Sequence, residues 1–399
     1  MLPIPDILRD FIRPTAAWYA AGAAVVLTLI GVMAIHTAEP AFGAKQLQWV
    51  PIALVVMVLA MLPHPKWIGY LAYPMSAVMV LMLVVLVLPG MPASFVPRVN
   101  GAKSWYDLGF MRFQPSEVAK IVFVLALGRY LRYRESYRTL TGLLVPFAFM
   151  LVPVALILKQ PDMGTAMVFA PTLLFVLVAV GAKMKHLMGV VGAAVLVVAI
   201  NVAMIYAFPV DGHPILQPHQ VKRIKSMVEL ARGEADVLGD AYQQNVAMNM
   251  IGSGGFNGYG AERSEVIVQF NHLPEDHNDM IFPVIVNRWG FVGGCVIIGL
   301  YMVIVLACLD VAARSKDPFG RVACVGFAGM VLTQTTINIG MTLGILPITG
   351  ITLPFVSYGG SSLLATFAMI GLILNFAARK PRLVTRPSFE FRNADAIFQ

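Results

Sequence analysis

Residues 18–36 read WYAAGAAVVLTLIGVMAIH, and none of these residues is a lysine, arginine, aspartate or glutamate. A helix needs about 20 mainly apolar residues to cross a bilayer. This run is too long for the core of a signal peptide, and no small-residue cleavage pattern follows it. We therefore expect it to be retained as a membrane helix, and similar runs recur along nearly the whole chain.

The composition points to the same class of protein. Hydrophobic residues make up 58% of the chain and charged residues 13%, against roughly half and a quarter in soluble domains. The runs lack the two-residue alternation of a membrane β-barrel. We predict an all-α polytopic membrane protein with about ten transmembrane helices. They are expected near residues 18–36, 48–63, 67–89, 116–131, 139–158, 164–182, 187–207, 280–310, 320–341 and 356–378.

The run near 280–310 is unusually long and contains Arg288 and Gly290. We expect it to bend, or its first turns to rise above the bilayer.

Basic residues set the expected orientation. They cluster after the fourth, sixth, eighth and tenth helices, as Arg129, Arg132, Arg134, Arg138, Lys183, Lys185, Arg314, Lys316, Arg321, Arg379, Lys380 and Arg382. The positive-inside rule makes these loops cytoplasmic. Both termini, including the tail 379–399, are then cytoplasmic, and the large loop 208–279 lies outside. Because the net charge of +8 is gathered in short loops, it does not indicate a nucleic-acid partner.

Four polar stretches fall on the outward side, and the first is RVNGAKSWYDLGFMRFQPSEVAK, residues 98–120. Its candidate residues are Arg98, Lys103, Trp105, Glu117 and Lys120. A proline followed by an acid suits a helix start, and an acid and a lysine three residues apart can pair on one helix face. The stretch fits an interfacial aromatic anchor before a capped helix, or a cationic surface for an anionic lipid head group.

Two further stretches are KQPDMGTA, residues 159–166, and GILPITGITLPFVSYGGSSLL, residues 344–364. Asp162 suits a tight turn and helix cap, which leaves the outward Lys159 unexplained. The second stretch breaks apolar sequence at membrane depth, which requires that its backbone be buried in protein or line a cavity. It then enters a glycine- and serine-rich helix start, either a packed break or an anion site. Its candidates are Ser357, Gly359, Gly360 and Ser361.

The fourth stretch is LPEDHNDMIF, residues 273–282. Asp279 directly precedes a predicted helix, so it is either an N-cap or a general base or cation ligand. The helix dipole favours an ionised carboxylate at this position. We therefore expect Asp279 to be deprotonated near neutral pH and able to accept a proton from a sugar hydroxyl. Glu275 and His277 either support it or are solvated loop residues.

The motifs also resemble a known family, the SEDS proteins (shape, elongation, division and sporulation). NGAKSWYDLGFMRFQPSEVAK is similar to the family's Asn-Gly-Ala-Lys-x-Trp opening and Gln-Pro-Ser-Glu-x-x-Lys close, and KQPDMGTA to its Lys-Gln-Pro-Asp-x-Gly-Thr turn. IGSGGFNGYG, residues 251–260, resembles its glycine-rich loop. LPEDHNDMIF and PITGITLPFVSYGGSS resemble its remaining signatures. The resemblance runs in order from about residue 98 to 364.

The resemblance implies a single SEDS domain over 1–399 and a peptidoglycan glycosyltransferase of the bacterial cytoplasmic (inner) membrane. It would polymerise lipid II at the outer face, where the C4 hydroxyl of one disaccharide attacks the anomeric carbon of another and expels undecaprenyl diphosphate. Asp279 aligns with the family's essential acid, and Glu117, Lys120, Lys159 and Trp105 with other functional positions. A class B penicillin-binding protein, a single-span transpeptidase, is the implied partner. A divalent cation is possible.

Departures from the family pattern are Asn278, Met280, Asn287 and Arg288, which change the charge beside Asp279. The PITG form favours the elongation (RodA-like) branch over the division branch. Two other functions stay open on the residues alone. A lipid II flippase or other transporter would use the same cations and broken helix, and a non-catalytic scaffold would only recruit a transpeptidase.

Overall fold

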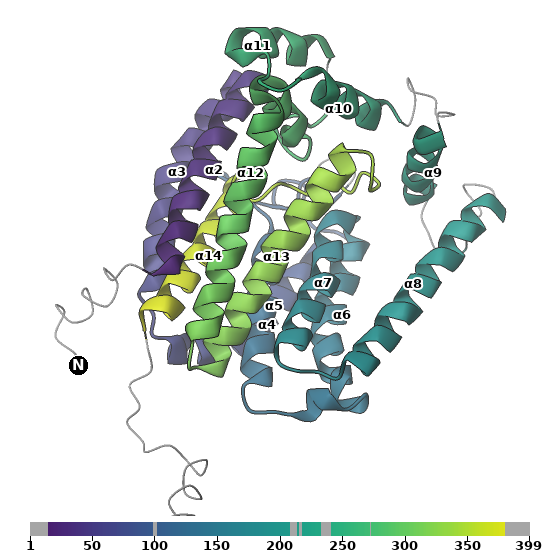
Figure 1. The fold of residues 1–399 in the computed structure, drawn as a ribbon. Helices are drawn as coiled ribbons and strands as arrows, with labels where there is room; N and C mark the ends of the chain where they lie inside the picture. Colours follow the sequence, from purple (N-terminus) through teal and green to yellow (C-terminus); the bar gives the residue numbers. More distant parts are fainter. Residues whose placement is uncertain are drawn as a thin grey trace, which may run out of the picture.

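The computed structural model describes residues 15–98, 102–207, 214, 218–232, 241–271 and 273–379. They form a bundle of long helices with shorter helices gathered at one end (Figure 1). The long helices are α2 (Ala16–Ala38), α3 (Pro40–Met61), α4 (Pro65–Val87), α5 (Pro115–Leu131), α6 (Leu144–Lys159), α7 (Met163–Ala179), α8 (Met184–Ala207), α12 (Ile281–Arg314), α13 (Pro318–Thr342) and α14 (Gly360–Ala378). Two 3-10 turns, η1 (Ser136–Arg138) and η2 (Thr141–Leu143), precede α6.

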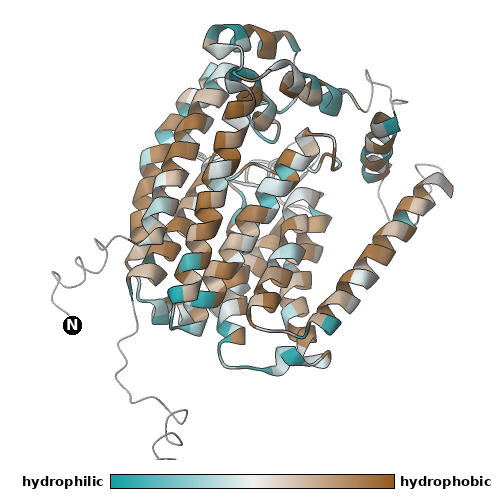
Figure 2. Ribbon diagram, in the orientation of Figure 1, coloured by the Kyte–Doolittle hydropathy of each residue, from teal (hydrophilic) through white to brown (hydrophobic). Residues whose placement is uncertain are grey.

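Apolar residues dominate the long helices, as Figure 2 shows. Within the described residues, eight helical segments are long and apolar enough to cross a membrane. The two remaining predicted helices, α5 and α7, are 17 residues each, and most of their residues are buried in the bundle. Each of the ten predicted segments therefore coincides with a helix, and the prediction of an all-α membrane protein is confirmed.

Two helix starts differ from the predicted ones. The segment expected from residue 48 begins at Pro40, because proline at the first helical position needs no hydrogen-bonded N–H group. The segment expected from residue 356 begins only at Gly360, because Leu353–Tyr358 forms a turn instead, in which the Val356 and Ser357 amides donate to the Leu353 carbonyl. The tail beyond residue 379 and the first 14 residues lie outside the described residues.

Close backbone approaches hold the centre of the bundle together. A Cβ atom on Gly31 of α2 would lie 2.4 Å from the Val356 carbonyl oxygen, and one on Gly371 of α14 would lie 2.2 Å from the Met57 carbonyl of α3. Only glycine permits such contacts between helices, since any side chain would push the backbones apart. The first approach fixes α2 against the buried segment that precedes α14, and the second fixes α14 against α3.

The outward loop predicted at 208–279 contains three helices. They are α9 (Pro218–Arg232), α10 (Tyr242–Ser253) and α11 (Gly260–Asn271). α10 and α11 pack on the first turns of α12, whereas α8 and α9 stand to one side of the bundle (Figure 1). The first outward loop forms a small hairpin that was not predicted, β1 (Tyr106–Asp107) against β2 (Arg112–Phe113).

The predicted bend in the long eighth segment is confirmed at Gly290. This residue has φ 69° and ψ −166° inside α12, a conformation that glycine adopts far more readily than other residues. A Cβ atom there would lie 2.3 Å from the Phe256 carbonyl oxygen and 2.4 Å from the Gly258 nitrogen. The loop between α10 and α11 therefore packs against the backbone at the bend. This contact holds α10 and α11 against the first turns of α12.

Gly290→Ala should lower the melting temperature of the purified protein by several degrees. The added methyl group meets backbone on both sides and the residue is held at positive φ, a cost of about 2 kcal/mol or more. Gly299→Ala is the matched control, because Gly299 lies on the same helix with nothing within 4 Å of its Cβ position. Equal melting temperatures for the two variants in detergent would contradict this account of the bend.

Candidate functional site

Asp279 lies in the loop between α11 and α12, and only 6% of its surface is exposed. The N-cap of α12 is Met280, and no side chain caps that helix. The reading of Asp279 as a helix cap is therefore wrong. Its Oδ1 atom is buried and has no hydrogen-bond partner among the described residues. A buried acceptor without a partner costs free energy, so this carboxyl group is held in place by the surrounding fold.

The protonation of Asp279 also differs from the expectation. Burial, with the negative charge of Glu275 as a second cause, raises its pKa from the ordinary 3.8 to about 7. The helix dipole was expected to keep the carboxylate ionised, but the loss of hydration outweighs it because the group is almost completely enclosed. At neutral pH the carboxyl group is therefore close to half protonated.

The loop that carries Asp279 is fastened to the segment 343–359, the broken-helix stretch of the sequence. The Asn338 side-chain amide donates to the Asp279 carbonyl at 2.8 Å and to the Ile351 carbonyl at 2.7 Å. Ser357 donates to the Asn278 carbonyl at 2.5 Å and accepts from the Leu353 amide. This segment is non-helical, and its central part, residues 351–357, is largely buried in protein, as the sequence required of backbone at membrane depth. It forms one wall beside the acid.

A second group of polar residues lies around Lys120. Its ammonium donates to Glu117 Oε1 at 2.9 Å and to Gln334 Oε1 at 3.1 Å, and the lysine and glutamate side chains are almost completely buried. Ser362 at the start of α14 donates to the other Glu117 oxygen at 3.0 Å. The predicted pairing of Glu117 with Lys120 is confirmed. A buried ion pair remains stable only when such additional hydrogen bonds satisfy it.

Asp162 is the centre of a third group. Its Oδ1 atom accepts from the Thr165 amide at 3.1 Å, so the predicted cap of α7 is confirmed. Its Oδ2 atom accepts from the Gln114 side-chain amide and from the Ser116 hydroxyl. Burial raises the pKa of Asp162, and the bonds from Thr165 oppose that rise. Asp162 therefore ties the turn before α7 to the start of α5.

Gln334 and Asn338 connect these groups, and the sequence analysis missed both. They lie four residues apart on one face of α13. Gln334 joins Lys120 to the Thr352 carbonyl, and Asn338 joins Asp279 to Ile351. Two amide side chains at this spacing within an apolar helix are a signal that could have identified them, because polar groups inside membrane helices are costly unless they are used.

The glycine- and serine-rich start of α14 faces groups of the chain itself. The Ser361 hydroxyl accepts from the backbone amide of Gln114, and the Gly359 backbone amide donates to the Gln46 side-chain oxygen. Gly360 lies against the Trp49 ring. The anion beside this helix start is Glu117. The sequence left open a packed break or an anion site here, and the structure places the chain's own carboxylate within hydrogen-bond distance of Ser362.

The other predicted residues are more dispersed. His277 stacks on Phe42 with 4.4 Å between ring centroids and contacts Asp276 at 3.2 Å. Lys103 and Trp105 are half-buried, and Arg98 and Lys159 are exposed. None of these three cations forms an ion pair with an acid of the described residues. No group of three or more potential metal ligands occurs in that part of the chain.

Arg223 on α9 is a third residue that the sequence analysis missed. Its guanidinium donates to the Ile348 carbonyl at 3.0 Å. Its charge opposes the rise in the pKa of Asp279, so it acts on the acid across the segment 343–359. The basic, strongly amphipathic character of residues 218–232 was the available signal.

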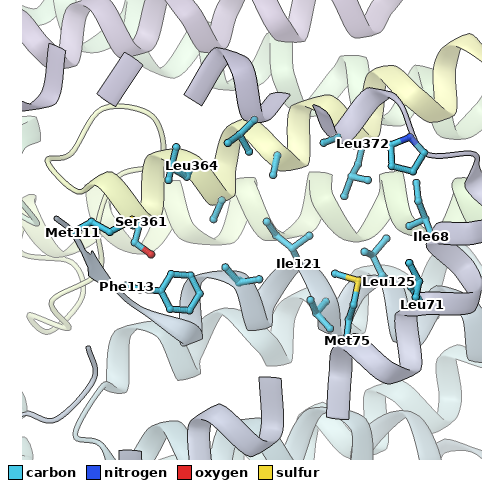
Figure 3. Close-up of a pocket in the computed structure, with 17 residues that line it drawn as sticks. Ile68, Leu71, Met75, Met111, Phe113, Ile121, Leu125, Ser361, Leu364 and Leu372 are labelled. Atoms are coloured by element: carbon cyan, nitrogen blue, oxygen red, sulfur yellow. The ribbon is translucent and has the colours of Figure 1, made fainter. Parts of the chain in front are cut away.

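An apolar groove of about 430 Å³ runs between α3, α4, α5 and α14 (Figure 3). Met111, Phe113 and Ser361 lie at one end, and Ile68 and Leu71 lie at the other. Ser361 and Phe113 adjoin Gln114, so this end of the groove meets the polar groups around Asp162 and Glu117. The groove therefore connects the polar site with the apolar depth of the bundle.

A family model described as a cell cycle protein, covering FtsW, RodA and SpoVE, matches residues 10–381. The chain belongs to this family. The peptidoglycan glycosyltransferase MrdB of Escherichia coli is 31% identical over 340 residues, which cover 85% of this chain and 86% of that protein. The SEDS resemblance is thereby confirmed.

Two solved structures share the fold. One, titled as a peptidoglycan synthase complex that coordinates polymerization and crosslinking, has a TM-score of 0.74 at 29% identity and covers 90% of this chain and 96% of the other. Rod shape determining protein RodA of Thermus thermophilus has a TM-score of 0.64 at 26% identity and covers 92% and 97%.

Asp279→Asn should stabilise the protein against heat, and more so as the pH rises. Between about pH 4 and 7 the folded protein keeps a proton on Asp279 that the unfolded chain releases, so wild-type stability falls across this window. The variant has no carboxyl group to titrate at this position, so it avoids this loss in the free energy of unfolding, which is on the order of 2–4 kcal/mol. Melting temperatures at pH 5 and 8 test this, with Asp310→Asn as control, because Asp310 is half-buried near the other end of α12 and pairs with Arg314. An equal gap between variant and wild type at both pH values would contradict it.

Proposed function

We propose that this protein is a peptidoglycan glycosyltransferase that polymerises lipid II at the outer face of the bacterial cytoplasmic membrane during cell elongation. The observation that carries the proposal is the buried Asp279 carboxyl group, which has an unpartnered oxygen and a pKa of about 7. A general base works best when its pKa lies near the working pH. The name of the Escherichia coli relative and the family membership support the same reaction.

In this proposal Asp279 accepts the proton of the acceptor's C4 hydroxyl. The hydroxyl oxygen forms a bond to the anomeric carbon of the donor while the bond from that carbon to the diphosphate breaks, with inversion. Asn338, which lies on α13, donates to the backbone carbonyl of Asp279. The carboxyl group is therefore positioned before the substrate arrives. Positioning of this kind lowers the entropic cost of bringing the reacting groups together.

Cations would stabilise the departing diphosphate. Arg223 is exposed on α9, and its charge already acts on Asp279, so it suits a group whose negative charge grows in the transition state. Lys120 is buried and balanced by Glu117. We assign Lys120, Glu117 and Gln334 to the framework that holds the segment 343–359 in place. The more exposed cations Arg98, Lys103 and Lys159 would bind the negatively charged head group of the lipid-linked substrate.

The apolar groove suits the long prenyl chain of the substrate. Its residues are almost entirely aliphatic, and Ser361 and Phe113 lie at the end that meets the polar site. The prenyl chain already lies in the apolar interior of the bilayer, so the groove would hold it by van der Waals packing rather than by the hydrophobic effect. The head group would then lie in the polar region that holds Asp162, Gln114 and Glu117.

A class B penicillin-binding protein is the proposed partner. The similar structure is titled as a complex that coordinates polymerization with crosslinking. A second apolar groove, of about 230 Å³, lies between α12 and α13 and is lined by Tyr301, Met302, Val305 and Thr335 among others. A groove between two membrane helices fits the single membrane helix of such a partner.

Asp279→Asn should fold and yet form no glycan chains. The amide has the shape of the carboxyl group but cannot accept the proton, so polymerisation should fall by at least roughly a hundredfold. The assay measures glycan chains from purified lipid II, with and without the cognate class B penicillin-binding protein. Asp310→Asn, which removes a half-buried acid near the other end of α12, is the matched control. Polymer from Asp279→Asn at the wild-type rate would refute the general-base role.

Glu275→Gln should shift the pH dependence of polymerisation. Wild-type activity should rise with pH through about 7 as Asp279 loses its proton. Removal of the Glu275 charge removes the second cause of the raised pKa, so the midpoint of this rise should move to lower pH while the maximal rate is kept. An unchanged midpoint with normal activity would show that Asp279 does not set the pH profile.

The same assay separates polymerisation from transport and scaffolding. A flippase would move lipid II across vesicle membranes without forming polymer, and a scaffold would tolerate Asp279→Asn in cells. Absence of polymer from the wild-type protein, with its partner and divalent cations present, would therefore exclude the proposed function.

A further inference from the structure

Arginine and tyrosine side chains form a cluster at the end of the bundle opposite Asp279. We call Arg129, Arg134, Tyr70, Tyr130 and Tyr133 the arginine–tyrosine cluster. The Arg129 guanidinium lies 5.1 Å from the Tyr70 ring centroid and 5.4 Å from that of Tyr133. Arg134 lies 4.8 Å from the Tyr130 ring centroid. Rings at these distances attract a guanidinium and hold its plane.

The hydrogen-bond donors of Arg129 and Arg134 are unused within the described residues. Neither side chain donates to a residue of that part of the chain or lies within 4 Å of one of its carboxylates. A nearby acid, Asp317, forms an ion pair with Arg132 instead, with 3.1 Å between the Arg132 guanidinium and Asp317 Oδ1. Arg129 is moreover half-buried. A guanidinium has five N–H donors in a fixed fork, and here aromatic rings hold two forks for which the described residues supply no acceptor.

The position of the cluster shows which acceptor can reach it. Arg129 lies in the last turn of α5, and Tyr70 lies near the start of α4, where helices leave the apolar part of the bundle. Trp67 and Tyr70 are 66% and 62% exposed, as in the aromatic belts at membrane surfaces. Exposed apolar residues flank the cluster on α4 and α6, at Leu71 and Leu144, and the exposed Lys66 and Glu135 lie at its edge. The cluster therefore opens sideways, towards lipid.

We propose that the arginine–tyrosine cluster binds the phosphodiester head group of an anionic phospholipid in the membrane leaflet opposite Asp279. Each guanidinium fork pairs with phosphate oxygens in the bidentate manner that arginine favours. The acyl chains lie along the exposed apolar residues of α4 and α6. An acidic protein segment would gain little from the exposed aromatic and aliphatic side chains of α4 and α6 beside the cluster, and it would be repelled by the exposed Glu135 next to Arg134. This site is separate from the proposed catalytic reaction.

Native mass spectrometry of the purified full-length protein tests the site. Cardiolipin, phosphatidylglycerol and phosphatidylcholine are titrated separately onto wild type and onto the double variant Arg129→Gln/Arg134→Gln. Wild type should bind the two anionic lipids roughly tenfold or more tightly than phosphatidylcholine. The double variant should lose most of that preference. The control, Arg138→Gln/Arg314→Gln, removes the same charge from exposed positions on this face and should bind like wild type.

Two further arms make the result specific. Arg134→Gln alone removes an exposed side chain and should lose part of the preference without affecting folding. Arg129→Lys/Arg134→Lys keeps both charges but loses the forks, and it should bind more weakly than wild type. Glycerol phosphate, which carries the phosphate without acyl chains, should compete poorly.

Several outcomes would overturn the proposal. They are an unchanged lipid preference in the double glutamine variant, an equal loss in the control, full binding by the lysine pair, or displacement of lipid by glycerol phosphate at similar concentration. The first two would show diffuse surface charge, the third a site without fork geometry, and the last a phosphate site that does not recognise lipid.

Discussion

The side-chain amide of Asn338 donates both of its hydrogens to backbone carbonyls of two different loops, at Asp279 and at Ile351. Within a membrane bundle such loops cannot obtain hydrogen bonds from water, so a buried side chain must supply them. One turn earlier on α13, Gln334 makes the corresponding link from Thr352 to Lys120. The non-helical segment 343–359 therefore keeps its shape because of two amides on one helix face, and the position of Asp279 depends on that segment.

This arrangement places unfavourable features around Asp279. The carboxyl group is buried with one oxygen unpartnered, and Glu275 and Phe355 adopt positive φ values of 57° and 66°. Such features persist only where the surrounding structure enforces them, and they are concentrated at functional sites. The backbone contacts of Gly31 with Val356 and the hydrogen bonds of Ser357 supply that enforcement. The same burial gives Asp279 a pKa near that of a useful base.

The sequence was sufficient to predict what depends on local pattern. Runs of apolar residues predicted the ten helices, Gly290 predicted the bend, and spacing predicted the pair of Glu117 and Lys120. Prediction from the sequence failed where two effects of opposite sign compete, and where interacting residues are distant along the chain. The helix dipole and burial act in opposite directions on Asp279, and only the structure shows that burial is nearly complete. Likewise, Asn338 is identified by its partners at positions 279 and 351, which no local pattern reveals.

The departures from the family pattern at Asn287 and Arg288 are accommodated locally. Asn287 is fully buried and accepts from Ser264 while its amide donates to the Met250 carbonyl and to Ser253. A carboxylate could not donate to that carbonyl, so an amide suits this position better than an acid would. Arg288 donates to the Met33 carbonyl on α2 and lies over Trp289 at 4.5 Å. Both residues therefore fasten α12 to its neighbours, α10 and α11 on one side and α2 on the other. They support the acid by holding the helix that follows it, and their own polar groups are directed to these partners.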